Sequence, residues 1–303
     1  MKRWVSLPAV VAFALAAAAQ AGQVTVGQAV PLSGLDANQG RAYSAGMQLC
    51  FSLTNKAGGV NGNTFTLVRK DDGGKPQETL AVTRQLLAES RPTVLAGYFG
   101  NKNIDGLVGS GILETEKISL VGYRVSDVRA DAPHLYSVRA GLRDEVKKFA
   151  EHVSTIGMTR LGLVYEESPN APALLAAMEE AAAQAKAQVV AKASSARMGE
   201  AIATMQTGNP QAILIVAGGA ATAGFIEQYR GAGRNGQLFA QSGADIEQLS
   251  KRLGDEQMQG VAIVQVTPSP YQIRTRLAKE FTDAISAANG VEVPVSYTMM
   301  EGF

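Results

Sequence analysis

Cysteine and histidine are scarce in this 303-residue sequence, which contains one cysteine and two histidines. A lone Cys50 cannot form an internal disulfide, and a typical zinc site would need more cysteine and histidine than the sequence offers. A cysteine nucleophile would also need a nearby histidine, so we expect Cys50 to be a buried, unreactive thiol. We expect a fold that needs neither a metal nor another cofactor, because a chain of this length can bury a sizeable hydrophobic core.

Charge of one sign is not in excess either, because 28 Lys and Arg residues stand against 27 Asp and Glu residues. Nucleic-acid binding favours a basic surface, so this balance argues against a nucleic-acid partner. Hydrophobic residues make up 46% of the sequence and no block of like charges occurs, which excludes a disordered chain. The length corresponds to about two domains of roughly 150 residues each.

The motifs of common catalytic and nucleotide-binding sites are missing from the sequence. It has no G-x-S-x-G nucleophile turn, no GxxxxGK[ST] phosphate loop and no HExxH zinc motif. Residues 231–236 match the dinucleotide fingerprint by letter, but they follow a predicted helix and precede a predicted strand, the reverse of the required order. We interpret them as a helix C-cap and turn, and Asp71 and Asp72 as part of another turn. The sequence therefore favours a protein that is not an enzyme.

The N-terminus has the pattern of a secretory signal peptide. Lys2 and Arg3 precede an uncharged, mostly apolar stretch over residues 5–19, and residues 19–21 read Ala-Gln-Ala, a small-x-small cleavage site. The alternative is an uncleaved membrane anchor, for which the apolar stretch is short. We expect cleavage after Ala21 and export of the mature chain.

Short β-branched runs alternate with amphipathic helical segments along the remaining chain. Residues 24–30, 64–69 and 212–216 are predicted strands, and residues 41–56 and 104–116 are predicted helices. Such alternation predicts an α/β fold in which helices cover both faces of a parallel sheet. The pattern restarts once midway along the chain, so we predict two successive units of this kind.

Three loops that follow predicted strands of the first unit are rich in small polar residues, namely residues 31–34, 97–103 and 122–126. Ligands of open parallel sheets bind at the carboxyl ends of the strands. The loop at 97–103 also leads into a predicted helix, whose free N–H groups attract an anion. We therefore expect ligand contact from residues 98–103.

Several segments of the sequence form a recognisable set, namely VGQAVPLSG at 26–34, the Gly-Gly-Val-x-Gly and Asp-Asp turns within 55–87, AGYFGN at 96–101, YSVRAG at 136–141 and GRNGQLFAQSG at 233–243. Through these segments the chain resembles periplasmic substrate-binding proteins of the leucine/isoleucine/valine-binding type, which serve ABC importers. The resemblance implies the α/β fold of a type I periplasmic binding protein, with two doubly wound parallel-sheet lobes joined by a hinge. Lobe 1 would comprise residues 22–138 and 267–303, and lobe 2 would comprise residues 139–266.

The resemblance also implies a function. A protein of this type captures an amino acid or a small organic carboxylate between its lobes in the periplasm, delivers it to the membrane permease of an ABC importer, and catalyses no reaction. A ligand-sensing receptor of the same fold, without a transport role, is the alternative. Family members continue past the segment that resembles residues 297–303, so we expect the chain to be truncated at its C-terminus.

The ligand contacts of amino-acid-binding members are changed in this sequence. By the resemblance, Asn101 replaces a serine that holds the ligand carboxylate, Asn170 replaces a tyrosine, and Ser242 replaces the glutamate that pairs with the ligand ammonium. A buried ammonium without a carboxylate partner is costly, so a plain aliphatic amino acid fits only if Asp245 or Glu166 substitutes.

A ligand with a ring or a second acid group is the open alternative. Tyr98, Phe99 and Tyr123 could stack on a ring. Arg124 or Arg139 could clamp a carboxylate, although a surface or interlobe salt bridge explains these arginines equally well. The candidate ligand-binding residues are Ser33, Gln39, Tyr98, Phe99, Asn101, Tyr123, Arg124, Asn170 and Ser242.

Overall fold

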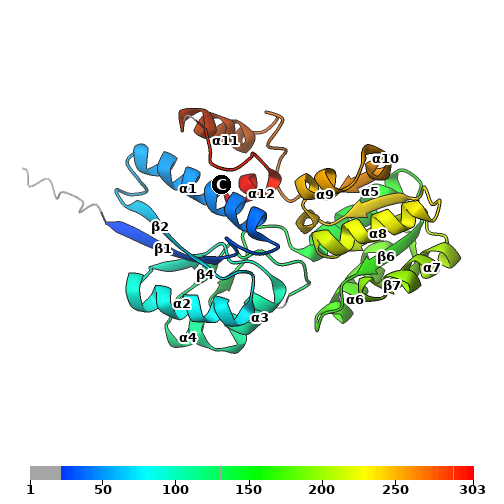
Figure 1. The fold of residues 1–303 in the computed structure, drawn as a ribbon, viewed down its shortest axis with the longest axis horizontal. Coiled ribbons are helices and arrows are strands. Elements are labelled where there is room, and N and C mark those ends of the chain that lie inside the picture. The colour runs from blue at the N-terminus through cyan, green and yellow to red at the C-terminus, as the bar shows by residue number, and fades with distance from the viewer. Residues whose placement is uncertain (1–21, 130, 289) are drawn as a thin grey trace, which may run out of the picture.

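Two parallel β-sheets form the frame of the molecule, one in each half of Figure 1. The computed structural model describes residues 22–129, 131–288 and 290–303. The predicted signal peptide, residues 1–21, lies outside the described residues. Within those ranges, no helix combines the length and the apolar character needed to cross a bilayer.

The first sheet has the strand order β2-β1-β3-β4-β5, and all its neighbouring strands are parallel. Val26 and Val30 of β1 pack with Met47 of α1 on one face, whereas Ala29 packs with Leu86 of α2 on the other. Because successive side chains of a strand point to opposite faces, helices cover both sides of the sheet. The elements are β1 (Gln23–Val30), α1 (Ala37–Lys56), β2 (Thr64–Asp71), α2 (Pro76–Ser90), β3 (Val94–Ala96), α3 (Asn101–Gly109), α4 (Ile112–Thr115), β4 (Leu120–Val121) and β5 (Leu135–Tyr136).

The second sheet has the order β10-β9-β8-β6-β7 and is also parallel. Its central strand β8 is buried along its whole length, with Ile213 packed toward α7 and α8 and Leu214 toward α5 and α6. The elements are α5 (Leu142–Thr155), β6 (Arg160–Tyr165), α6 (Ala171–Gln184), β7 (Gln188–Ser194), η1 (Ser195–Arg197), α7 (Met198–Gly208), β8 (Ala212–Val216), α8 (Gly219–Gly231), β9 (Gln237–Ala240), η2 (Ser242–Ala244), α9 (Ile246–Arg252), α10 (Asp255–Met258) and β10 (Val261–Ile263).

After β10 the chain returns to the first lobe, where α11 (Arg276–Ala287) and α12 (Tyr297–Gly302) pack against α1 (Figure 1). The contact between α1 and α12 is unusually close. A Cβ at Gly46 would lie 2.1 Å from the carbonyl oxygen of Met299, and one at Gly302 would lie 2.1 Å from the carbonyl oxygen of Tyr43. Glycine at both positions therefore lets the two backbones touch.

The predicted fold class is confirmed, because the two lobes each contain a parallel sheet with alternating helices. The strands of the first sheet fall within predicted lobe 1 and those of the second within predicted lobe 2, while the exact lobe boundaries stay predictions. Two helix predictions were wrong in detail. The helix predicted over 104–116 is two helices, because Gly111 adopts a left-handed φ of 67° between them, and α1 begins at Ala37 instead of residue 41.

Candidate functional site

The junction between the lobes is lined by loops that follow strands of both sheets. The loop after β4 supplies Arg124 and Asp127, the loop after β6 supplies Asn170, and the turn after β9 supplies Ser242. Hydrogen bonds cross the junction from Arg124 to Ser242 and from Asn170 to Asp127. The carboxyl ends of the two sheets therefore meet here, which is where parallel sheets bind ligands.

Arg124 lies at the centre of the junction, with its side chain only 7% exposed. Its Nη1 donates to Oε1 of Gln39 on α1, and its Nη2 donates to the carbonyl of Ser242 at 3.3 Å. Its Nε lies 3.2 Å from Oε2 of Glu301 on α12. The guanidinium carbon also lies 5.5 Å from the ring centroid of Phe99, within the range of a cation–π contact. Arg124 thus contacts both lobes at once.

A second arginine completes what we call the junction network, which consists of Arg124, Arg139, Glu145, Ser242 and Glu301. Arg139 places Nη1 3.2 Å from Oε1 of Glu301, and its Nη2 donates to Glu145 at 3.3 Å and to the Ser242 hydroxyl. Glu145 accepts at 2.8 Å from both the backbone N–H and the hydroxyl of Ser242. Burial raises the pKa of Glu145, while Arg139 and Ser242 oppose that rise. The network holds two positive and two negative groups.

Asn101 lies in a neighbouring cluster of the same junction. Its Oδ1 accepts the backbone N–H of Ser126 at 2.8 Å, and its carbonyl accepts from Arg129 at 3.3 Å. Arg129 also donates to Oδ2 of Asp127 at 3.1 Å, and Asn170 donates to the same oxygen at 2.7 Å. Burial raises the pKa of Asp127, and Arg129 and Asn170 oppose that rise. Asn101 therefore fixes the loop that carries Arg124.

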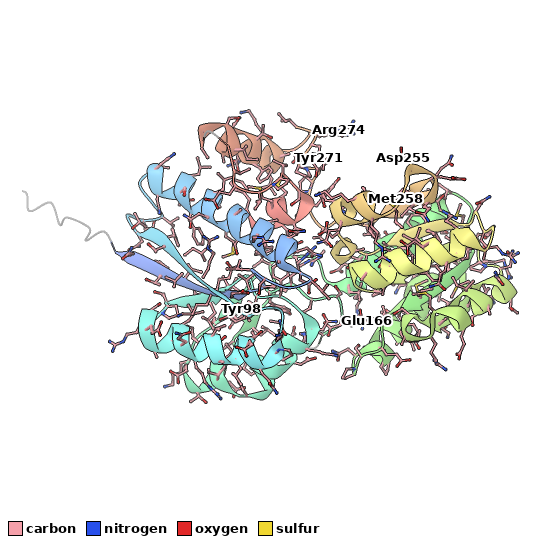
Figure 2. All side chains as sticks on the ribbon, viewed as in Figure 1. Tyr98, Glu166, Asp255, Met258, Tyr271 and Arg274 are labelled. Atoms are coloured by element: carbon pink, nitrogen blue, oxygen red, sulfur yellow. The ribbon has the colours of Figure 1, made fainter. Side chains whose placement is uncertain are left out.

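Not every candidate residue lies at the junction. Tyr98 is fully buried in the core of the first lobe, with its hydroxyl 3.0 Å from that of Thr83, so its ring does not face the junction between the lobes (Figure 2). Tyr123 is half-buried against the same core. Ser33 is exposed beside the end of β2. Gln39, Phe99, Asn101, Arg124, Asn170 and Ser242 are the candidates that meet at the junction.

Four charged residues of the junction were missed by sequence reasoning as site residues, namely Asp127, Arg129, Glu145 and Glu301. Asp127 and Arg129 follow the polar loop at 122–126, which the sequence already indicated as a candidate ligand loop. The polar composition of that loop was therefore the signal that could have found them. Glu145 and Glu301 lie on helices at positions that look like ordinary solvent-facing acids, and nothing local distinguishes them. Arg139, which the sequence offered as a clamp or an interlobe salt bridge, does form a salt bridge with Glu301.

A pair of carboxylates lies beside the junction network, on and just before α9. Asp245 is 7% exposed, and its Oδ1 accepts the N–H of Gln248 at 3.2 Å. Glu247 Oε1 accepts from the Tyr271 hydroxyl at 2.7 Å and from the N–H of Tyr297 at 2.9 Å, while its buried Oε2 has no hydrogen-bond partner among the described residues. Burial, together with Glu247, raises the pKa of Asp245 to about 6.

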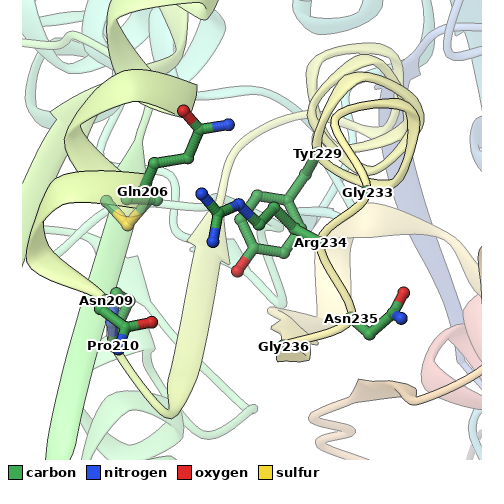
Figure 3. A pocket seen from close by; sticks show the side chains of 9 residues that line it. Gln206, Asn209, Pro210, Tyr229, Gly233, Arg234, Asn235 and Gly236 are labelled. Carbon is green, nitrogen blue, oxygen red and sulfur yellow. The ribbon is translucent and has the colours of Figure 1, made fainter.

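Two surface pockets lie away from the junction. One of about 250 Å³ is lined by the C-terminal ends of α7 and α8 and by residues 233–236 (Figure 3). Because Pro210 precedes β8 and Gly236 precedes β9, this pocket lies at the amino ends of the strands, opposite the junction. The other, of about 270 Å³, lies between α5 and β10.

The predicted turns are confirmed. Helix α8 ends at Gly231 and β9 begins at Gln237, so residues 231–236 form a helix end and turn. Asp71 Oδ1 accepts three backbone N–H groups, one of them from Gly73. Cys50 is half-buried, not fully buried as expected, and burial raises the pKa of its thiol. In the part of the chain that the structure describes, no three His, Cys, Asp or Glu side chains group as metal ligands would.

Comparison with known proteins identifies the family to which this architecture corresponds. Residues 23–303 match the family model described as periplasmic binding protein. A substrate-binding periplasmic protein from Ralstonia solanacearum, known from a crystal structure, is 30% identical with a TM-score of 0.81, and the match covers 92% of this chain and 81% of that chain.

Two curated relatives match shorter segments. An amino acid binding protein from Pseudomonas aeruginosa is 33% identical over 76 residues, which are 25% of this chain and 20% of the relative. A Leu/Ile/Val-binding protein homologue from Brucella melitensis is 31% identical over 108 residues, which are 36% of this chain and 26% of the relative. The chain thus aligns with 26% or less of the length of either curated relative. Because the family model spans nearly all the described residues and the two-lobed fold agrees with it, the chain belongs to the periplasmic binding protein family.

Proposed function

We propose that the chain is the periplasmic ligand-binding component of an ABC importer, and that it captures an amino acid or a small organic carboxylate between its lobes. The observation that carries the proposal is the buried guanidinium of Arg124, which contacts both lobes where the carboxyl ends of two sheets meet. A guanidinium binds carboxylates through paired, charge-assisted hydrogen bonds. The names of the two curated relatives, an amino acid binding protein and a Leu/Ile/Val-binding homologue, support this ligand class.

The junction supplies polar contacts from both lobes for such a ligand. Arg124 and Asn101 of lobe 1 and Ser242 and Asn170 of lobe 2 are the proposed polar contacts, and Phe99 lies under the Arg124 guanidinium. Because these groups come from both lobes, a ligand held by them favours the closed arrangement of the lobes. Binding followed by release to a membrane permease needs no chemical change in the ligand.

A ligand screen tests the binding function. Thermal shift with amino acids and with aliphatic and aromatic carboxylates should reveal a stabilising ligand, because ligand at ~100 times Kd adds about 2.7 kcal/mol of stability. Calorimetry would then compare the wild type with Arg124→Gln and with Arg143→Gln, which removes an exposed arginine of lobe 2. Loss of a charged hydrogen bond should lower the affinity of the Arg124 variant by about tenfold to a hundredfold.

The outcomes separate the alternatives. Unchanged affinity in Arg124→Gln would exclude Arg124 as the ligand contact, and an equal loss in Arg143→Gln would show a general charge effect. Uptake of the same ligand by vesicles that contain the permease supports import, whereas binding without uptake would favour a sensing receptor. Intact mass of the exported protein checks the proposed cleavage after Ala21, because a retained Met1 would contradict it.

A further inference from the structure

Glu301 occupies both arginines of the junction network. Its Oε2 lies 3.2 Å from Nε of Arg124 and its Oε1 lies 3.2 Å from Nη1 of Arg139, with the glutamate side chain 8% exposed. The carboxylate therefore lies between two guanidinium groups, in the position that a bound acid would take. It comes from α12, far along the chain from both arginines.

The two arginines are not fully satisfied by Glu301. Nε of Arg124 and Nε of Arg139 are buried, and neither has a hydrogen-bond partner within the described ranges. Glu301 lies 3.2 Å from one nitrogen of each arginine without good hydrogen-bond geometry, so N–H donors of both guanidinium groups stay available to another acceptor. Glu145 is differently placed, because its two oxygens already accept three hydrogen bonds from Ser242 and Arg139. Glu301 is thus the carboxylate of the network that a ligand can displace.

The charge balance of the junction network indicates which kind of ligand can displace Glu301 from Arg124. Two arginines and two glutamates are neutral together. A simple carboxylate placed on Arg124 would leave Glu301 buried without a full partner, which is strongly unfavourable. A zwitterion also brings an ammonium group, so that three positive and three negative groups remain paired.

We propose that Glu301 is the ammonium partner of the ligand: the ligand carboxylate takes the place of Glu301 on Arg124, and Glu301 pairs with the ligand ammonium. This inference rests on the proposed function and makes zwitterionic amino acids the preferred ligand class over simple carboxylates. It assigns to Glu301 on α12 the acidic contact that is missing at Ser242, where the resemblance places a glutamate. Asp245 is the competing acid, because it is buried nearby and is influenced by the charge of Arg124.

The test compares L-leucine with 4-methylpentanoate, which has the same side chain and carboxylate but no ammonium. Calorimetry would use the wild type, Glu301→Gln, Asp245→Asn and the exposed control Glu151→Gln. We expect Glu301→Gln to bind L-leucine about tenfold or more weakly and to bind 4-methylpentanoate at least as well as the wild type does. Asp245→Asn and Glu151→Gln should keep the wild-type preference for L-leucine.

Three results would overturn the inference without refuting the proposed function. The first is unchanged L-leucine affinity in Glu301→Gln, and the second is a selective loss of L-leucine in Asp245→Asn, which would move the ammonium to that residue. The third is a wild type that prefers 4-methylpentanoate, which leaves the proposed binding function intact. A wild type that binds neither of these probes nor anything in the ligand screen would refute the proposed function as well. If Glu301→Gln does not fold, Glu301→Asp keeps the charge but withdraws it from the ligand ammonium, so it should weaken L-leucine binding without improving 4-methylpentanoate binding.

Discussion

Replacing Asp245 with asparagine should stabilise the folded chain at neutral pH and leave its stability almost unchanged near pH 4. Asp245 has a left-handed φ of 56°, which asparagine tolerates better than most residues do. Its Oδ1 accepts the N–H of Gln248 at the start of α9, and an asparagine oxygen can accept the same hydrogen bond. The substitution therefore removes the charge of a buried group while the local backbone and the helix cap are kept.

The magnitude follows from the pKa of this carboxyl group. Burial, with Glu247 as a further cause, raises the pKa of Asp245 to about 6 from its usual value of 3.8. A tenfold change in proton affinity corresponds to about 1.4 kcal/mol, so the difference amounts to about 3 kcal/mol. Because the folded state binds this proton more tightly than the unfolded state, the free energy of unfolding falls as the pH rises from 3.8 to about 6. Above about pH 6 the loss is complete.

Urea unfolding followed by circular dichroism between about pH 4 and pH 8 measures this difference. The curves of unfolding free energy against pH for the wild type and Asp245→Asn should diverge across the window and lie up to about 3 kcal/mol apart above it. Glu151→Gln, an exposed acid on α5, controls for the loss of one negative charge. Parallel curves for the wild type and Asp245→Asn would refute the reasoning, because a group that does not favour its proton in the folded state cannot produce this divergence.

Three further substitutions test the core, the helix contact and the junction. Tyr98→Phe should cost about 1 kcal/mol in urea unfolding, since it removes the hydroxyl contact with Thr83, and should leave ligand affinity unchanged; a large affinity loss would place the ring in the site after all. Gly46→Ala should cost about 1–3 kcal/mol or more, because its Cβ would lie 2.1 Å from a carbonyl of α12; an unchanged melting temperature would contradict that contact. Asn101→Leu should weaken ligand binding by about tenfold to a hundredfold, because it frees the loop that carries Arg124; calorimetry that finds equal affinity would exclude this role.

Much of the fold could be predicted because its signals are local. The run Ala212–Val216 is buried on both faces, and its composition alone predicts a central parallel strand. The alternation of strands and helices then predicts covered parallel sheets in both halves. The single helix predicted over residues 104–116 was wrong because hydrophobic periodicity does not report backbone conformation. The apolar spacing continues across Gly111, but the left-handed φ at this glycine ends the helical hydrogen bonding, and periodicity does not record it.

Only part of the candidate site could be predicted from the sequence, for a similar reason. Tyr98 and Phe99 both follow β3, and the sequence treats them alike as rings near a ligand. Consecutive residues of an extended segment point in opposite directions. Phe99 consequently lies beneath the Arg124 guanidinium, whereas Tyr98 enters the core beside Thr83. The position of a loop can be predicted from the strand before it, but the direction of each side chain cannot.

The pairing of Arg124 with Glu301 depends on contacts that no local pattern contains, and α1 positions both partners. The Tyr43 hydroxyl on α1 donates to the carbonyl of Gly122 at 2.9 Å, two residues before Arg124. The Tyr43 carbonyl lies against Gly302, which directly follows Glu301. One residue of α1 thus fixes the backbone on both sides of the ion pair. Because both partners are held from one helix of lobe 1, the ion pair between Arg124 and Glu301 needs no contact from lobe 2, whereas Glu145 and Ser242, which complete the junction network, come from lobe 2.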